Sequence, residues 1–317
     1  MRKILITGAL GQIGSELTMG LRKIYGNDNV IASSRRVKEG HDALMESGVF
    51  EIVNVTDGKQ LSEVVRKHNV DTIIHLAAVV SAVGEQNPAR AWDVNMNGTY
   101  NILEIAREEN CSVFTPSSIA VFGPSTPKEN TPQDTIQRPN TIYGVTKTAG
   151  ELLCDYYYQK FGVDTRGVRF PGLISYETLP GGGTTDYAVH IYYDALKNKK
   201  YTSFIDKGTK MDMMYMPDAL NAITQLLEAD PSKLIHRNAF NVTAMSFEPE
   251  EIAASIKKVI PEFELDYDVD PVRQAIADSW PNSLDDSAAR EEWGWNPKYD
   301  LDAMTKDMLE KLKIKLK

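Results

Sequence analysis

The chain has 317 residues, of which 42% are hydrophobic and 25% charged, a composition typical of a folded globular protein. Its formal net charge of −9 disfavours nucleic acid or an anionic membrane surface as the main partner. No apolar run reaches the roughly 18 residues that a membrane-spanning helix needs, so we expect no membrane partner.

The start of the chain and its cysteines and histidines bear on compartment and metals. A strand-like segment begins by Ile4, so we expect no signal or transit peptide. Cys111 and Cys154 are too few for a disulfide framework, which favours a reducing, cytoplasmic location. The five histidines are scattered without the spacing of metal ligands, so we expect no metal.

The first half of the chain alternates short apolar runs with helical patterns. In chain order, the sequence predicts a strand at 3–9, a helix at 13–26, strands at 29–33 and 50–55, a helix at 61–69, a strand at 71–78, a long helix at 91–110 and a strand at 111–118. Such alternation predicts an α/β fold with a doubly wound parallel sheet of the Rossmann type.

The second half of the chain has a different composition and pattern. After about residue 170 the chain becomes rich in glycine and proline, and the regular alternation of strands and helices stops. We therefore expect a dinucleotide-binding domain over 1–170. Residues 171–317 should form mainly a smaller substrate-binding lobe, with some segments returning to the first domain.

Three glycines lie between the first predicted strand and the first helix. Gly8, Gly11 and Gly14 form G-x-x-G-x-x-G, which suits a tight turn that brings a dinucleotide pyrophosphate to a helix N-terminus. The alternative is a glycine-rich connection without a ligand, but the strand before it and the helix after it favour the cofactor.

The end of the second strand bears on which cofactor binds. Ser34 stands where NAD-binding folds usually carry an acid for the ribose 2′-hydroxyl, and Arg35 and Arg36 follow it. Arginine at this place suits the 2′-phosphate of NADP. Both arginines could instead be solvated loop charges, so this pattern leaves NAD and NADP open.

Tyr143 and Lys147 are spaced one helical turn apart, about 25 residues after a strand that ends near Ser118. Ser118 could orient a substrate oxygen, Tyr143 could act as general base, and Lys147 could lower the pKa of the tyrosine toward neutrality. The same spacing recurs at 156/160 and 193/197, but neither of those pairs has a strand-end serine upstream, which favours ordinary helix surface.

Several motifs together resemble the extended short-chain dehydrogenase/reductase superfamily: TGxxGxxG, HLAA at 75–78, DVNMNGTYN at 93–101, SSIAVFG at 117–123 and YGVTK at 143–147. In the second half, PGGGTTDYA and SWPNSLDDSAAR are similar to the short-chain type of L-threonine 3-dehydrogenase. The resemblance implies NAD-dependent oxidation of L-threonine to 2-amino-3-oxobutyrate in a homodimer paired through long helices.

The motifs and the resemblance together give a set of expected site residues. The catalytic residues are Tyr143, Lys147 and Ser118, and the substrate-binding residues are Ser81, Thr184, Thr185 and Asp186. The cofactor-binding residues are Gly8, Gly11, Gln12, Ile13, Gly14, Ser34, Arg35, Asn54, Val55, Leu76, Ala77, Ala78, Asn95, Tyr143, Lys147 and Pro171. Family members mostly carry an acid in place of Ser34, and often proline in place of Asp212, a change that the sequence does not explain.

An amino acid substrate needs an anion for its ammonium and donors for its carboxylate. Asp186 suits the ammonium, and hydroxyls with the backbone N–H groups of 181–185 suit the carboxylate. The alternative for Asp186 is a role at the start of the helix near Tyr187, which is compatible with substrate binding. Trp280 is expected to be a core residue rather than a ligand contact.

Two other functions remain possible from the residues alone. A nucleotide-sugar epimerase or dehydratase would need cations for a diphosphate, and Arg166, Arg169, Arg237, Arg273 and Arg290 are not clustered in sequence. A non-catalytic dinucleotide-sensing protein commonly lacks the tyrosine or the lysine, and both are present here.

Overall fold

The computed structural model describes residues 2–179 and 182–317. These residues form two compact units, and each is described by itself. The first unit comprises Met1–Val121, Asn140–Arg169 and Leu220–Phe240, and the second comprises Phe122–Pro139, Phe170–Ala219 and Asn241–Lys317.

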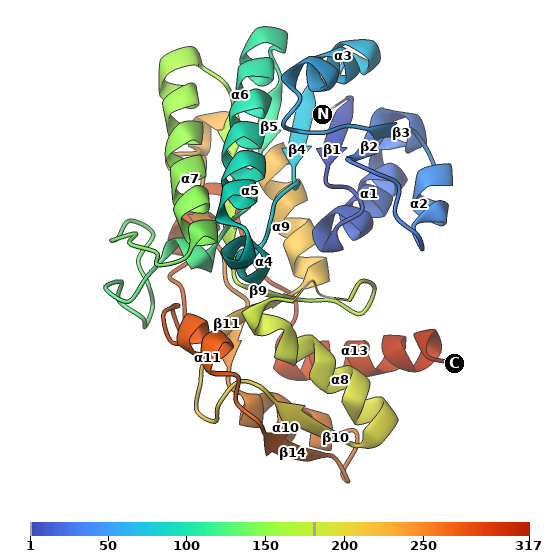
Figure 1. The fold of residues 1–317 in the computed structure, drawn as a ribbon, viewed down its shortest axis with the longest axis vertical. Helices are drawn as coiled ribbons and strands as arrows, with labels where there is room; N and C mark the ends of the chain where they lie inside the picture. Colours follow the sequence, from blue (N-terminus) through green and yellow to red (C-terminus); the bar gives the residue numbers. More distant parts are fainter. Residues whose placement is uncertain (1, 180–181) are drawn as a thin grey trace. The chain divides into compact units, whose positions relative to one another are not determined.

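The first unit is built on a six-stranded parallel sheet with the order β3-β2-β1-β4-β5-β7 (Figure 1). Its strands are β1 Ile4–Thr7, β2 Val30–Ser34, β3 Phe50–Ile52, β4 Thr72–His75, β5 Ser112–Phe114 and β7 Thr165–Arg166. Its helices are α1 Gln12–Tyr25, α2 Asp42–Glu46, α3 Gly58–His68, α4 Ser81–Gln86, α5 Pro88–Trp92, α6 Gly98–Glu109 and α7 Ile142–Phe161. The predicted α/β fold with a doubly wound parallel sheet is confirmed.

The helices cover the sheet because the strands are apolar on both faces. All four residues of β1 and all four of β4 are buried. On one face, Leu5, Ile31, Ile73 and Val113 pack in one core cluster with apolar residues of α3, α6 and α7. Continuous burial of this kind is what a parallel sheet between helical layers requires.

Two predicted elements differ in the structure. The helix expected over 91–110 is interrupted by a π-helical turn at Asp93–Asn97, between α5 and α6. The strand expected over 111–118 ends at Phe114, and β6 Ser117–Ser118 belongs instead to a sheet of order β12-β8-β6. Pro116 lies between the two strands and lacks the N–H that a continuing ladder would need.

Apart from β6, which lies in the first unit, the remaining strands and helices belong to the second unit or cross a unit boundary, as β8, α9 and β12 do. A three-stranded sheet has the order β13-β11-β9, and β10 pairs with β14 in parallel. The remaining elements are β8 Val168–Phe170, β9 Gly172–Ile174, α8 Tyr187–Asn198, β10 Lys200–Ser203, β11 Met211–Tyr215, α9 Met216–Glu228, β12 Phe240–Asn241, β13 Met245–Phe247, α10 Pro249–Lys257, β14 Glu264–Tyr267, α11 Pro271–Ala277, α12 Ser287–Trp293 and α13 Leu301–Lys315. The unit boundaries at Ala219/Leu220 and Phe240/Asn241 fall within α9 and β12.

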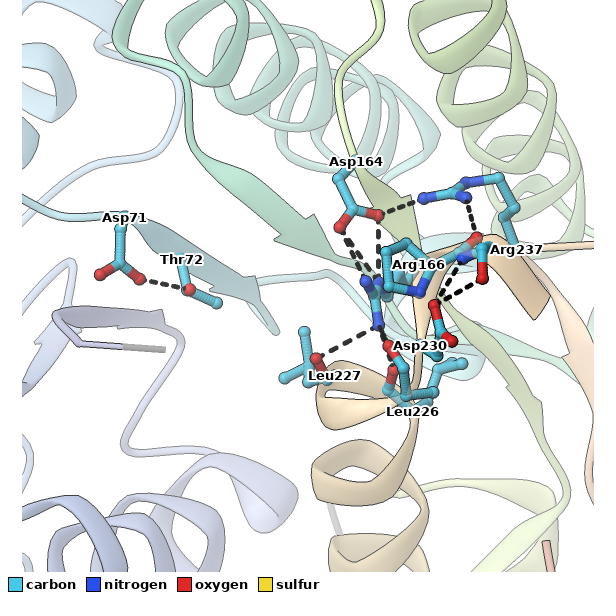
Figure 2. A network of polar contacts seen from close by, with 11 residues as sticks. Asp71, Thr72, Asp164, Arg166, Leu226, Leu227, Asp230 and Arg237 are labelled. Carbon is cyan, nitrogen blue, oxygen red and sulfur yellow. Dashed lines mark hydrogen bonds and ion pairs between the residues drawn. The ribbon is translucent and has the colours of Figure 1, made fainter. Parts of the chain in front are cut away.

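A polar network holds the returning segment Leu220–Phe240 in the first unit (Figure 2). The guanidinium of Arg166 donates to the carbonyl oxygens of Leu226 at 2.7 Å and Ala229 at 2.8 Å, at the C-terminal end of α9. It also pairs with Asp164 at 2.9 Å, and Arg237 reaches the same carboxylate at 2.6 Å. Burial by itself would raise the pKa of Asp164, but the two arginines hold it below its ordinary value.

Asp212, which the sequence left unexplained, is a fully buried residue of β11 in the second unit. Its carboxyl group accepts a hydrogen bond from the Thr243 hydroxyl at 2.6 Å and from the Leu284 amide at 3.1 Å. Burial raises its pKa well above the ordinary value, with these hydrogen bonds opposing the shift. Asp212 therefore ties three segments of the second unit together through its buried carboxyl group.

No helix within the described ranges is both long and apolar enough to cross a bilayer.

Candidate active site

The glycine-rich turn between β1 and α1 is shaped by backbone contacts that exclude side chains. Gly8 has a φ of +72°, and a Cβ placed on it would lie 2.7 Å from the backbone nitrogen of Ala77. A Cβ on Gly14 would lie 2.8 Å from the Cα of Ala9. The turn therefore places the start of α1 close to the carboxyl ends of β1 and β4.

The N-terminus of α1 is suited to bind an anion. Gly11 is its N-cap residue and supplies no side-chain cap, so the first backbone N–H groups of α1 have no capping oxygen. The side-chain nitrogen of Gln12 is buried there without a hydrogen-bond partner. Uncapped N–H groups and an orphaned amide at a positive helix end fit a pyrophosphate.

The other expected cofactor residues lie in the same unit, except for Pro171, which belongs to the second unit. Ser34 ends β2, and Arg35 follows it as an exposed residue. Asn54 and Val55 follow β3, with the Asn54 amide bonded to the Gln60 side chain at 2.8 Å. Leu76, Ala77 and Ala78 follow β4 directly.

Asn95 lies in the π-helical turn and is fully engaged with protein groups. Its side chain accepts from the Val79 amide at 2.8 Å, donates to the Val79 carbonyl at 3.0 Å, and donates to the Thr146 hydroxyl at 3.1 Å. Asn95 therefore braces the chain after β4 against the helix that carries Tyr143 and Lys147. A π-helical turn commonly marks a functional position.

Ser118, Tyr143 and Lys147 are brought together by β6 and α7. The Ser118 hydroxyl lies close enough to the Tyr143 phenol to affect the pKa of the phenol. Lys147 places its ammonium 5.6 Å from the centre of the Tyr143 ring and donates to the carbonyl oxygen of Pro116 at 2.7 Å. Thr141 caps α7 by accepting a hydrogen bond from Gly144, so the helix starts at Ile142, one residue before Tyr143.

The two titratable groups of this set have opposite shifts. Burial raises the pKa of Tyr143 to about 12, and the nearby Ser118 hydroxyl opposes the rise. Burial lowers the pKa of Lys147 to about 8, while the carboxylate of Glu151 opposes the fall. In the protein alone the phenol is thus less acidic than an ordinary tyrosine, contrary to the expectation that Lys147 brings it toward neutrality. Desolvation dominates the shift, and Ser118 rather than Lys147 opposes it.

The other two Tyr-x-x-x-Lys pairs differ in their partners. Tyr156 is an exposed residue of α7. Tyr193 has an ammonium near its ring much like Tyr143, with Lys197 at 5.8 Å, but its hydroxyl points to the Tyr176 carbonyl oxygen at 3.4 Å. The contact with a strand-end serine therefore distinguishes Tyr143, and the ring-to-ammonium distance does not.

Lys147 lines a small cavity. Its volume is about 30 Å³, enough for a water molecule or two, and His75, Asn95, Thr146 and Glu151 are among the residues that line it. His75 is hydrogen bonded to Thr7 at 2.8 Å, and burial, with the nearby charge of Lys147, lowers the pKa of His75 to about 3. The imidazole is therefore neutral around pH 7.

The expected substrate residues are divided between the units. Ser81 begins α4 in the first unit and is buried. Thr184, Thr185 and Asp186 form a 3₁₀ turn before α8 in the second unit. Asp186 accepts backbone hydrogen bonds from Gly182 at 2.8 Å and Gly183 at 2.5 Å. Of the backbone donors expected at 181–185, residue 181 lies outside the described residues. Trp280 is buried, as a core residue would be.

The sequence offered helix capping near Tyr187 as the alternative role of Asp186. Asp186 is the N-cap residue of α8, but its side chain makes no cap hydrogen bond to that helix and accepts instead from its own loop. Burial raises the pKa of Asp186 above its ordinary value, and the amides of Gly183 and Gly182 oppose the shift. The structure thus supports the loop-holding role, and the ammonium-binding role stays a prediction.

Sequence reasoning missed a buried ion pair beside the catalytic residues. Glu151 lies on α7 one turn beyond Lys147 and pairs with Arg169 of β8 at 2.9 Å. The spacing of Tyr143, Lys147 and Glu151 by four residues could have signalled a shared helix face. The strand partner Arg169 had no local signal.

The Rossmann-type fold and the Ser–Tyr–Lys set are typical of dinucleotide-dependent enzymes. Comparison with known proteins identifies the family. The model of the NAD dependent epimerase/dehydratase family matches residues 4–242, and the chain belongs to this family. An uncharacterized epimerase/dehydratase of Staphylococcus saprophyticus is 61% identical over 100% of this chain and 99% of the relative.

Among solved structures, the chain is similar to L-threonine dehydrogenases. The enzyme from Clostridium difficile is 70% identical with a TM-score of 0.98, over 99% of this chain and 98% of that chain. The enzyme from Phytophthora infestans is 51% identical with a TM-score of 0.95, over 99% of each chain. A 44% identical L-threonine 3-dehydrogenase from a metagenome is described as monomeric. The resemblance stated from the motifs is confirmed.

Proposed function

We propose that the protein oxidises L-threonine at its 3-hydroxyl to 2-amino-3-oxobutyrate, with NAD as the hydride acceptor. The observation that carries this proposal is the joined Ser118–Tyr143–Lys147 set in a chain 70% identical to an L-threonine dehydrogenase over nearly its whole length. A phenol beside a serine hydroxyl is the arrangement needed to take a proton from a secondary alcohol.

In this mechanism Tyr143 accepts the proton of the threonine 3-hydroxyl, and Ser118 orients the same oxygen by hydrogen bonding. A bound oxidised nicotinamide would supply the hydride acceptor for C3 and a positive charge in the site. Because the pKa of Tyr143 is about 12 in the protein alone, ionisation of the phenol depends on the cationic charge assembled around it. Lys147 supplies part of that charge as an ammonium.

The chain's own residues fit a dinucleotide. The uncapped start of α1 and the unpaired Gln12 amide would hold the pyrophosphate. Gly8 and Gly14 let neighbouring backbone segments approach this turn more closely than a Cβ would allow. The turn after β2 would face the adenosine ribose, so Ser34 and Arg35 bear on the choice between NAD and NADP.

We further propose that Asp186 binds the substrate ammonium, with Ser81, Thr184 and Thr185 contacting the rest of the amino acid. Asp186 is buried, and the backbone N–H groups of Gly182 and Gly183 both donate to the same carboxylate oxygen, Oδ2. A carboxylate can accept further hydrogen bonds through its other oxygen, so loop holding and ammonium binding are compatible.

The homodimer is proposed from an apolar surface of the first unit. Large exposed side chains lie on α5 and α6, which follow each other in the chain, and on α7, which packs against both (Figure 1): Trp92, Tyr100, Val145, Leu152 and Tyr156. Such a surface suits a second copy of the chain. A cytoplasmic location is proposed because both cysteines are free and buried thiols.

The ion pairs made by the arginines weaken the nucleotide-sugar alternative. Each of the five that could have met a diphosphate pairs with a carboxylate of its own unit. Arg166 and Arg237 pair with Asp164, Arg169 with Glu151, Arg273 with Asp270 and Arg290 with Asp286. Releasing any buried one would leave an unpaired charge, which is costly.

Initial rates test the proposal. The purified protein is mixed with L-threonine and either NAD or NADP, and formation of the reduced cofactor is followed. L-allo-threonine, with the opposite configuration at C3, is the control substrate, and UDP-glucose tests the alternative. We expect turnover with L-threonine and NAD. Conversion of UDP-glucose without oxidation of L-threonine would overturn the proposal.

A further inference from the structure

A buried ion pair lies in the first unit, one turn of α7 from Lys147. Glu151 and Arg169 have side chains that are only 5% and 7% exposed. Arg169 donates from Nε at 3.0 Å and from Nη2 at 2.9 Å to the two carboxylate oxygens, so the pairing is bidentate. The Ser117 hydroxyl donates to Oε1 of Glu151 as well. Ser117 immediately precedes Ser118.

Two turns of α7 therefore hold the short segment that carries Ser118. Lys147 binds the carbonyl oxygen of Pro116 at 2.7 Å, and one turn later Glu151 binds the side chain of Ser117. Ser118 and Tyr143 lie on this segment and on this helix, respectively. A shift of β6 along α7 would separate their hydroxyl groups.

Stability alone does not explain an ion pair at this place. A buried pair loses so much hydration that apolar side chains of similar volume are often equally or more stabilising. An apolar pair could pack α7 on β8, but it could not hold the Ser117 hydroxyl or place a negative charge one turn from Lys147.

A strained loop adds a third contact to the same place. Asn238 donates to the carbonyl oxygen of Glu151 at 3.0 Å. Its neighbours Arg237 and Ala239 have φ angles of +53° and +58°, a left-handed region that is unfavourable for non-glycine residues. A Cβ on Gly167 would lie 2.9 Å from the Asn238 side-chain oxygen, so the loop lies tightly against the residue that links β7 and β8. Strain retained beside a reactive centre is a common mark of function.

We propose that Glu151, through Arg169 and Ser117, is a positioning residue for the reaction: it fixes the register of Ser118 against Tyr143 and keeps an anion next to the Lys147 ammonium. This inference rests on the proposed function for the identity of the reaction. The positions of the side chains do not depend on it.

Titratable groups from three elements lie around Lys147. His75 on β4 is neutral, Glu151 and Cys154 lie on α7, and Arg169 on β8 is paired with Glu151. Among these groups the Glu151 carboxylate favours the charged form of Lys147 against burial. Without it, the amine should lose its proton at lower pH.

Two variants separate register from charge. Ser117→Ala removes one contact and leaves the ion pair, whereas the double variant Glu151→Met/Arg169→Met removes the charges and keeps apolar packing. Asp164→Asn, in the other buried network of the unit (Figure 2), is the matched control for general destabilisation. If the double variant does not fold, Glu151→Gln takes its place.

Activity and a lysine titration are then measured. In Ser117→Ala we expect kcat to fall about tenfold with KM nearly unchanged, and in the double variant about a hundredfold. The alkaline limb of the kcat profile should move to lower pH in the double variant only. NMR of protein labelled at the lysine Cε, with Lys147 assigned from Lys147→Met, should show its pKa lowered in the double variant and unchanged in Asp164→Asn.

The titration does not depend on threonine being the substrate. If wild type fails to oxidise L-threonine, the proposed function fails while the titration still decides the electrostatic role of Glu151. Unaltered kcat in both Ser117→Ala and the double variant would overturn the inference. An unchanged Lys147 pKa in the double variant would overturn it as well.

Discussion

Lys147 donates a 2.7 Å hydrogen bond to the carbonyl oxygen of Pro116, two residues before Ser118. The ammonium thereby tethers the strand end that supplies the serine, and it also lies 5.6 Å from the centre of the Tyr143 ring. One side chain joins the two elements that carry the reactive hydroxyl groups. Substitutions at Lys147 should therefore alter geometry and charge together, so the cleaner tests lie at neighbouring residues.

Replacing Tyr143 tests its role as the base. Tyr143→Phe should lower kcat at least about a hundredfold, the usual range for losing a positioned acid–base group, and leave cofactor affinity nearly intact. Tyr156→Phe is the matched control, because Tyr156 is an exposed tyrosine of the same helix with the same lysine spacing. Near-normal turnover in Tyr143→Phe combined with an inactive Tyr156→Phe would show that the wrong tyrosine was chosen.

Asp186→Asn tests substrate binding against loop holding. Loss of a charge-assisted contact should raise KM for L-threonine strongly. Loss of hydrogen bonding from Gly182 and Gly183 alone should instead lower the free energy of unfolding by about 1 kcal/mol with little kinetic change. Steady-state kinetics and urea unfolding of the same samples distinguish the two. Normal KM in a less stable variant would remove Asp186 from the substrate site.

Cofactor choice depends on the turn after β2. Arg35 is exposed, and no hydrogen bond or ion pair is found for it in the described part of the chain. Its attraction for a 2′-phosphate should be modest because solvent screens it. We expect NAD to be preferred, NADP to be measurably active, and Arg35→Ala to lower kcat/KM for NADP selectively. A wild-type preference for NADP of about tenfold or more would contradict the NAD assignment.

The proposed dimer is tested on α7. Leu152 is 61% exposed on this helix, so Leu152→Asp places a charge on the apolar surface of α5–α7. Light scattering after size exclusion should show a dimer for wild type and a shift toward monomer for the variant. Ile24→Asp on α1, where Ile24 is 62% exposed, should leave the mass unchanged. A monomeric wild type would end this proposal.

Asp212 should make stability depend on pH. Its folded-state pKa is raised above the unfolded value of about 3.9, so its contribution is fully present below that pH and is lost as pH rises through the folded-state pKa. Asp212→Asn, which stays neutral, should gain about 1 kcal/mol or more relative to wild type between pH 4 and pH 8. Urea unfolding at both values measures this gain.

The control for Asp212 is an exposed aspartate of the same unit. Asp206 lies in a turn and bonds the amide of Lys207. Asp206→Asn should change stability by similar small amounts at both pH values. An Asp212 variant that behaves like the Asp206 variant would mean that the Asp212 carboxyl group ionises freely.

Much of the fold followed from local patterns. The apolar runs predicted the parallel strands, and the three glycines after β1 predicted the turn into α1, because both signals depend on neighbouring residues. The strand expected over 111–118 ended early because Pro116 redirects the chain, and Ser117 and Ser118 found a partner far away in sequence. Pairing with a strand far away in the sequence produces no local hydrophobic pattern that could predict it.

The sequence by itself determined the family, the α/β fold and the tyrosine–lysine spacing on one helix. Tertiary structure decided which Tyr-x-x-x-Lys pair meets a serine, and it showed that burial outweighs Lys147 in setting the pKa of Tyr143. It also joined Glu151 to Arg169 and gave Asp212 its partners. Helical spacing is fixed by residues a few positions apart, whereas desolvation and ion pairing depend on which distant segments the core brings together.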